Sequence, residues 1–131
     1  KREFAVQRQY VWFVPYDLHL QDMIDAAAVL EGDHDFSAFC RRGEAKEPFQ
    51  TVINSASLDE YEEEIHFEIS GIRYFHNMVR ILTGTLVDVG RNKLSAADFR
   101  DILLSGDRTR AGMTAPAKGL FLKKVIYKED T

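Results

Sequence analysis

The 131-residue sequence has only one cysteine, Cys40, and no long apolar run. A single cysteine excludes a disulfide within the chain and is typical of proteins from a reducing, cytosolic compartment. No apolar stretch approaches the roughly 20 residues that a membrane-spanning helix needs, and no signal peptide opens the chain. These absences predict a cytoplasmic protein that has no membrane segment.

Common catalytic motifs are also missing. The sequence has no GxGxxG stretch, no Walker-type loop and no nucleophile elbow, and Cys40 has no evident partner for nucleophilic catalysis. Asp33, His34 and Asp35 are metal-ligand residue types, but three consecutive loop positions lack useful spacing, and no Cys pair or His-x-x-His supports them. We therefore expect no metal site, and a packed thiol at Cys40.

Length and composition indicate one domain. Hydrophobic residues make up 45% and charged residues 29% of the chain, which is ordinary for a globular domain of this size. The sequence does not begin with methionine. We expect residues 1–131 to form a single domain cut from a longer protein.

The net charge of −4 is unevenly distributed along the chain. Residues 1–65 contain 14 acidic and 6 basic side chains, whereas residues 71–128 contain 4 acidic and 11 basic ones. A cation-rich half can bind a polyanion such as a nucleic acid even when the whole chain is acidic. The alternative is a solvated surface whose asymmetry has no function.

Hydrophobic periodicity predicts an α+β domain, mainly an antiparallel sheet with helices packed on one face. The alternation of apolar and polar residues in EEEIHFEISG is the clearest strand signal, and it predicts a hairpin with the run before it. Ser95 and Asp98 form a capping-box pattern, and Gly106 ends the helix that follows. The expected strands cover 10–14, 49–58, 62–71 and 119–127, and the expected helices cover 17–32 (capped by Asp17), 72–90 and 94–106.

The helix expected at 72–90 carries an unusual stripe. Its apolar residues fall on one face, whereas the polar residues and a glycine gather within about one third of the circumference on the other. Glycine costs about 1 kcal/mol of helix stability relative to alanine, so a close approach at Gly84 is one explanation. The other is an amphipathic helix with a solvated back and a helix-packing glycine. The residues of the stripe are Arg73, His76, Asn77, Arg80 and Gly84.

Four segments in order, DFSAF (35–39), FHNMVRILTGTLVDVG (75–90), SGDRTRAGMTAPAKGLFL (105–122) and the terminal VIY, resemble the TruA-type tRNA pseudouridine synthases. The resemblance covers essentially the whole chain and corresponds to the C-terminal half of that enzyme. It implies a homodimeric enzyme that isomerises uridine to pseudouridine in the tRNA anticodon stem-loop, without a metal or an organic cofactor. The family's catalytic aspartate, in a GRTDAG-type motif, is absent from these residues.

The resemblance also implies roles for individual residues. Arg80 matches the active-site arginine, which would hold the catalytic carboxylate in its ionised form, and Leu120 matches the aliphatic residue under the flipped base. Gln50 stands where the family usually has arginine, which puts one phosphate or structural contact in doubt. The residues expected to face RNA are Arg73, His76, Asn77, Arg108 and Lys118.

Two other classes of function stay open from the residues. A noncatalytic RNA-binding module could keep this fold without the aspartate-bearing half. A protein–protein adaptor would draw on the acidic first half of the chain.

Overall fold

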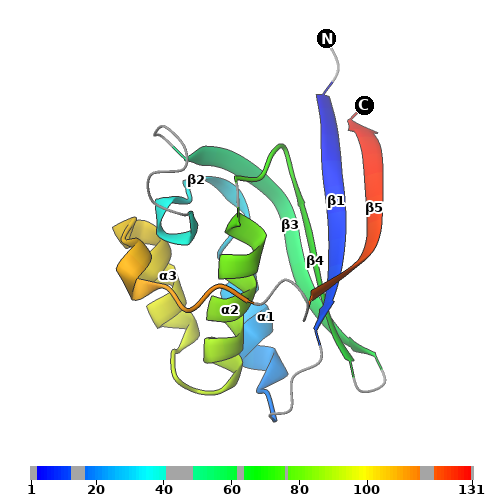
Figure 1. Ribbon diagram of the computed structural model, residues 1–131. Coiled ribbons are helices and arrows are strands. Elements are labelled where there is room, and N and C mark those ends of the chain that lie inside the picture. Colours follow the sequence, from blue (N-terminus) through cyan, green and yellow to red (C-terminus); the bar gives the residue numbers. More distant parts are fainter. Residues whose placement is uncertain are drawn as a thin grey trace.

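The computed structural model describes residues 3–12, 17–40, 49–61, 64–75, 77–115 and 120–130. Strands and helices are interspersed along the chain (Figure 1). The elements are β1 (Glu3–Trp12), α1 (Leu20–Ala28), β2 (Gly32–Asp35), the short 3-10 helix η1 (Ser37–Phe39), β3 (Gln50–Tyr61), β4 (Glu64–Gly71), α2 (Met78–Gly90), α3 (Ala96–Ser105), the 3-10 helix η2 (Arg108–Arg110) and β5 (Leu120–Asp130).

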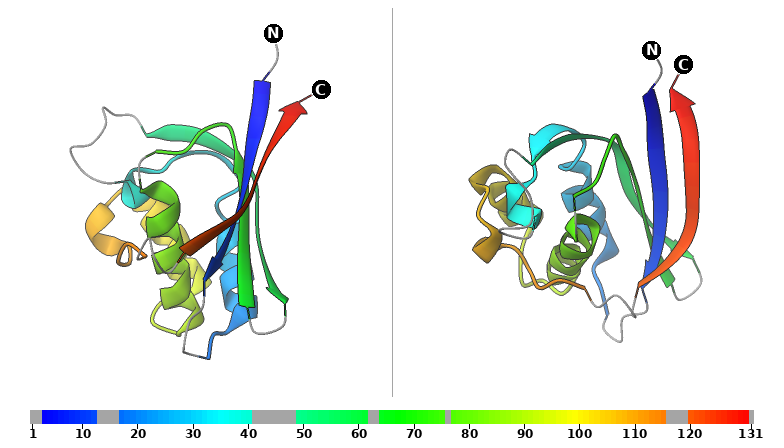
Figure 2. Two further views of the ribbon diagram at one scale, coloured as in Figure 1. Left: turned by 45° about the vertical axis from the view of Figure 1, so that its right-hand side comes forward. Right: turned by 45° about the horizontal axis from the view of Figure 1, so that its top comes forward.

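The five strands form one sheet in the order β2-β3-β4-β1-β5, and every neighbouring pair is antiparallel. In both views of Figure 2, helices α1, α2 and α3 stay on the same side of this sheet. The predicted α+β class is therefore confirmed. The start of β1 and the end of β5 lie side by side, since Glu3 pairs with Asp130.

The predicted hairpin is β3 and β4. Phe67 and Ile69 of β4 are buried, and they pair with the buried Leu58 and Ala56 of β3. The alternate positions of β4, such as His66, remain partly exposed. Alternation along a strand places successive side chains on opposite faces, so one face of this hairpin packs under the helices.

Helix α3 begins and ends where the sequence predicts. The Ser95 hydroxyl accepts a hydrogen bond from the Asp98 backbone N–H at 3.0 Å, and the Asp98 carboxylate accepts from the Ser95 N–H at 2.9 Å. The bond from the Ser95 backbone N–H, with a smaller contribution from the Ser95 side chain, holds the pKa of the Asp98 carboxyl below its usual value. Gly106 follows the last turn with φ 65°, a left-handed conformation that glycine adopts without steric strain.

Helix α1 is shorter than the predicted 17–32, and Asp17 is not its cap. The helix begins at Leu20, and the residue before it, His19, donates its backbone N–H to Gly90 O of α2 at 2.8 Å. At the other end the helix stops at Ala28, and Gly32 with φ 111° already opens strand β2. Contacts with residues distant in sequence therefore set both ends of this helix, and the local signals at Asp17 and Gly32 do not.

Strand β2 was not predicted, because its residues were assigned to a loop. Gly32 to Asp35 pair with Ile53 to Gln50 of β3 and form one edge of the sheet.

Among the described residues, no helix has both the length and the apolar character needed to cross a bilayer.

Candidate active site

Helix α2 has no solvated back. Eleven of its 13 residues are buried, and only Arg80 and Asp88 are partly exposed. The expected division into an apolar face and a wet polar face is therefore wrong. Gly84, which was placed on the wet face, is one of the buried residues.

The helix begins at Met78 and not at 72. The preceding residues hydrogen-bond to the sheet: Ile72 N–H donates to Val52 O, and the Thr51 hydroxyl donates to Arg73 O, both at 3.0 Å. Asn77 then adopts φ 61°, a left-handed conformation that asparagine tolerates better than most residues. Arg73 thus lies before the helix, and the stripe drawn from helical periodicity does not include it.

The segment 111–115 covers the face of α2 that was expected to be solvated. A Cβ atom at position 84 would lie 1.8 Å from Met113 O, so the two backbones are in contact at Gly84. The expected close approach at this glycine is confirmed, and the partner is the chain itself. The contact continues on either side, because Gly112 N–H donates to the Thr85 hydroxyl at 2.9 Å and Ala115 N–H donates to Arg80 O at 3.0 Å.

The Arg80 side chain is held at two points. Its Nε–H donates to Ala115 O at 2.8 Å, and its Nη1 donates to the Asn77 side-chain oxygen at 3.2 Å. A guanidinium has five N–H donors. The bonds to these described residues therefore leave one N–H on Nη1 and two on Nη2. These donors form the flat end of the group, which can grip both oxygens of a carboxylate or a phosphate.

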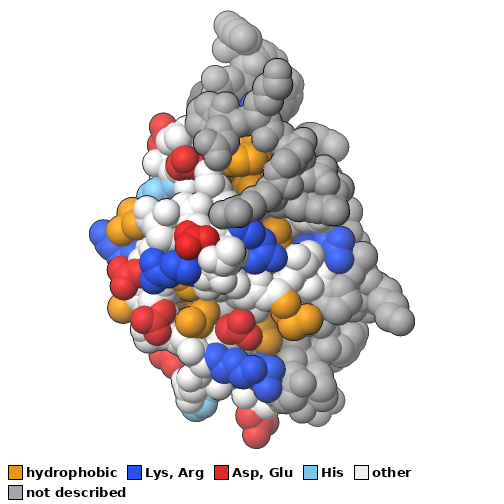
Figure 3. Space-filling view, turned by 60° about the vertical axis from the view of Figure 1, so that its left-hand side comes forward, with side chains coloured by type: hydrophobic (Ala, Val, Ile, Leu, Met, Phe, Trp, Pro, Cys, Tyr) orange, Lys and Arg blue, Asp and Glu red, His pale blue; other side chains and the backbone are white. Residues whose placement is uncertain are grey.

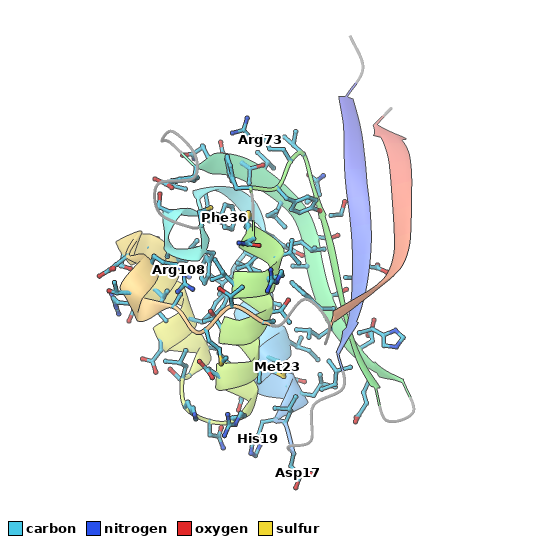
Figure 4. All side chains as sticks on the ribbon, in the orientation of Figure 1. Asp17, His19, Met23, Phe36, Arg73 and Arg108 are labelled. Carbon is cyan, nitrogen blue, oxygen red and sulfur yellow. The ribbon has the colours of Figure 1, made fainter. Side chains whose placement is uncertain are left out.

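Arg108 begins η2 and turns toward the same segment. Its Nη1 donates to Gly112 O at 3.1 Å, and its Nη2 donates to the Thr114 hydroxyl at 3.3 Å. The side chain is partly buried. Figure 4 shows Arg108 beside the chain that runs on from η2, whereas Arg73 lies apart from it at the far end of the sheet.

Arg73 is exposed, and its guanidinium carbon lies 4.4 Å from the centre of the Phe75 ring. Stacking on an aromatic face fixes the orientation of a guanidinium and leaves its N–H groups at the edges. His76 and Lys118, two further residues expected to face RNA, lie outside the described residues. Leu120 opens β5, where its backbone pairs with Trp12.

Asp33, His34 and Asp35 each have a partner within the protein. Asp33 accepts a hydrogen bond from the Gln50 side chain at 3.0 Å, and a ring nitrogen of His34 lies 2.8 Å from Glu31 O. Asp35 accepts from the backbone N–H of the following turn. Across the described parts of the chain, no group of three or more His, Cys, Asp or Glu residues gathers as metal ligands. Gln50 is thus paired across β2 and β3.

Cys40 is buried, as expected for a packed thiol. Burial, with a smaller contribution from the Asp35 carboxylate, raises the pKa of the thiol to about 12. A thiol that stays protonated at neutral pH is a poor nucleophile. Its chemistry therefore gives no support to covalent catalysis at this residue.

Charged side chains of both signs occur on the helical side of the molecule. Figure 3 shows Lys and Arg side chains interspersed with acidic ones on that face. Among the described residues on this face, the basic side chains do not form an uninterrupted patch. Contacts of these side chains with a polyanion would be few and local.

Periodicity alone missed two residues of the site. Thr85 and Ala115 contact Arg80 and its neighbours, yet neither had a functional signal in a generic motif. Thr85 is fully buried, and its hydroxyl donates to Ile81 O at 2.8 Å while it accepts from Gly112. The sequence signal available was a threonine beside a glycine within a predicted helix, a pair that leaves room for a backbone to pack against the helix.

Fold and site together define an α+β domain in which a largely buried helix presents an arginine, held by two hydrogen bonds, beside a closely packed loop. The sequence model for "tRNA pseudouridine synthase" matches residues 26–128. The chain therefore belongs to the tRNA pseudouridine synthase family.

Relatives named tRNA pseudouridine synthase A occur in several bacteria. The chain is 41% identical to the one from Thermoanaerobacter sp. over 127 residues, which covers 97% of this chain and 52% of the relative. For Bacillus licheniformis the identity is 40% over 122 residues, with 92% and 49% covered. For Syntrophomonas wolfei it is 38% over 131 residues, with 100% and 53% covered. The chain spans about half the length of these curated relatives.

Proposed function

We propose that this chain is the C-terminal half of an enzyme that isomerises uridine to pseudouridine in the anticodon stem-loop of tRNA. In this reaction the N1–C1′ bond breaks, the uracil turns, and C5 joins C1′. C5 then loses its hydrogen and N1 gains one, so no atom is added or removed. The complete enzyme acts in the cytoplasm as a homodimer, and no metal or organic cofactor takes part.

The position of Arg80 carries the proposal. Arg80 matches the family's active-site arginine in the sequence resemblance, and this supports the proposal. Ala115 O and Asn77 hold the guanidinium so that its flat end remains for a partner. An arginine fixed in this way favours the ionised form of a carboxylate that it grips. The carboxylate belongs to the aspartate of the other half, and Arg80 keeps it charged beside the ribose.

The remaining site residues serve the RNA. Leu120 forms the apolar floor under the base that leaves its stack. Arg73, stacked on Phe75 with its edges exposed, contacts phosphate. His76, Asn77, Arg108 and Lys118 are the further residues that we expect to contact RNA. By itself the chain forms no pseudouridine, because these residues orient a nucleophile and do not replace it.

The test joins this chain to the N-terminal half of the Thermoanaerobacter relative in place of that protein's own C-terminal half. Uridine with tritium at C5 releases it during the isomerisation, so tritium release from labelled tRNA measures turnover. We expect turnover in the fusion and none with the isolated chain. If the fusion fails to fold, the two halves are co-expressed as separate chains and assayed together.

Arg80→Lys is the decisive variant. It keeps the charge and loses the planar fork, so kcat should fall about 10²-fold or more, as for the loss of one preorganised electrostatic contact. Arg100→Lys, an exposed change on α3, is the matched control and should leave turnover unchanged. A folded fusion that binds tRNA without releasing tritium would favour the noncatalytic RNA-binding module. Full activity of Arg80→Lys would remove Arg80 from the site.

A further inference from the structure

The segment 111–115 has no regular secondary structure, yet side chains from three places fix its backbone. Both polar groups of Gly112 are satisfied in this way, since its N–H donates to Thr85 and its carbonyl accepts from Arg108. Ala115 is bonded through both its N–H and its carbonyl to Arg80. The same few residues therefore hold the segment and contact the candidate active-site arginine.

We propose that Thr85 and Arg108 are positioning residues that orient the Arg80 guanidinium through the segment 112–115. This inference rests on the proposed function, because it concerns the arginine of that site. It gives Arg108 a second role besides its expected contact with RNA.

Thr85 fixes one end of the segment with a defined hydrogen-bond direction. Its hydroxyl has one proton, which is donated to Ile81 O, so an oxygen lone pair faces Gly112 N–H. The side chain is fully buried, and an unsatisfied N–H beside it would be unfavourable. Thr85→Val keeps the shape and removes the acceptor, whereas Thr85→Ser keeps the acceptor.

Arg108 fixes the middle of the segment. Its two terminal nitrogens bond Gly112 O and the Thr114 hydroxyl, one acceptor each, so the planar fork matches two points on one stretch of chain. Loss of the fork frees the chain immediately before Ala115. Ala115 O is the acceptor of the Arg80 Nε–H, so motion of the segment is transmitted to the guanidinium.

Position 84 explains why the segment can act in this way. Met113 O lies so close to Gly84 that no side chain fits between them, and the segment rests directly on the helix that carries Arg80. A Cβ at position 84 would displace the segment, so Gly84→Ala is a second way to disturb Arg80. This variant keeps the Thr85 and Arg108 side chains themselves unsubstituted.

The first test needs no catalysis. In the ¹⁵N-labelled chain, the Arg80 Nε–H signal is assigned by its loss in Arg80→Lys, and its exchange with solvent is measured. Thr85→Val and Arg108→Ala should each speed this exchange about tenfold, as for the loss of about one hydrogen bond, and Gly84→Ala should speed it at least as much. Thr85→Ser should restore slow exchange. Arg110→Ala removes the same charge from the other end of η2 and should not change it.

The second test uses the fusion enzyme. Thr85→Val should lower kcat about tenfold with little change in KM, because the bound substrate meets a misplaced arginine. Thr85→Ser should recover the rate. Backbone amide spectra of α3 and β4 establish that each variant is folded before it is compared.

The outcomes separate this inference from the proposed function. Unchanged Nε–H exchange in folded Thr85→Val and Arg108→Ala overturns the positioning link, whatever the enzyme does. Faster exchange with unchanged kcat overturns the catalytic relevance of the positioning. No tritium release from a folded fusion overturns the proposed function, and full activity of Arg80→Lys removes Arg80 from the active site, while the exchange data still judge whether the segment orients Arg80.

Discussion

Replacing Gly84 by alanine should destabilise the protein, although alanine is the better helix former. A Cβ at this position would lie 1.8 Å from Met113 O and 3.0 Å from Met113 C, both backbone atoms. Real Cβ atoms essentially never come closer than 3.0 Å to such an atom. The Cβ–O distance to Met113 must therefore grow from 1.8 Å to at least 3.0 Å, so helix and segment must separate by about 1.2 Å. Hydrogen bonds of 2.8 to 3.0 Å between them cannot survive that shift.

The magnitude follows from opposing contributions. Alanine in a helix interior is favoured over glycine by about 1 kcal/mol. Three hydrogen bonds join the segment to α2, two between Arg80 and Ala115 and one between Thr85 and Gly112. Their loss at about 1 kcal/mol each leaves a net destabilisation of roughly 2 kcal/mol.

Denaturant unfolding of the isolated chain measures this value. Met113→Ala is the control, because the Met113 side chain is 70% exposed and the Met113 atoms that approach Gly84 belong to the backbone. That control should lie within about 0.5 kcal/mol of the wild type. An unchanged or increased stability of Gly84→Ala would show that the segment does not rest on the helix, and the argument for positioning would lose its basis.

Four further outcomes are expected. Ser95→Ala should lower the unfolding free energy by about 1 kcal/mol, because it removes the hydroxyl that accepts from the Asp98 N–H; wild-type stability of this variant would contradict the cap. Arg80→Lys should lower the unfolding free energy by about 1 kcal/mol, because lysine lacks the Nε–H that donates to Ala115 O. A melting temperature equal to that of wild type would count against this hydrogen bond. In the folded protein the pKa of Cys40 is about 12, above its ordinary 9.0. The protonated thiol therefore contributes stability that is complete below pH 9 and is lost as pH rises toward 12. Wild type should lose more stability over that window than Cys40→Ala. Binding of tRNA to the isolated chain should be weak, with a slope of log affinity against log salt of about −2 to −5, and salt-independent binding would contradict the expected phosphate contacts.

Local signals predicted α3 and the β3–β4 hairpin well. The cap of α3 needs only Ser95, Asp98 and Gly106, which lie within one short stretch of chain. The hairpin needs only alternation and a turn between neighbouring strands. Such interactions form between residues close in sequence, so the sequence pattern contains most of the information.

Elements whose ends depend on distant partners were predicted less well. Helix α1 begins where His19 meets Gly90, and β2 exists because β3 offers an edge to pair with. Neither partner can be inferred from the composition of the segment itself. The loop assignment of 33–35 failed for this reason.

The sequence alone determined the family, through motifs that match in order and spacing, and it drew attention to Arg80 and Gly84 before any coordinates. It could not determine how the stripe is used. Hydrogen bonds between the sheet and residues 72 and 73 set the start of α2 at Met78. The packing of 111–115 buries the helix face that periodicity predicted to be solvated. Periodicity describes which side chains share a face of a helix, but only the tertiary contacts of segments distant in sequence decide what covers that face.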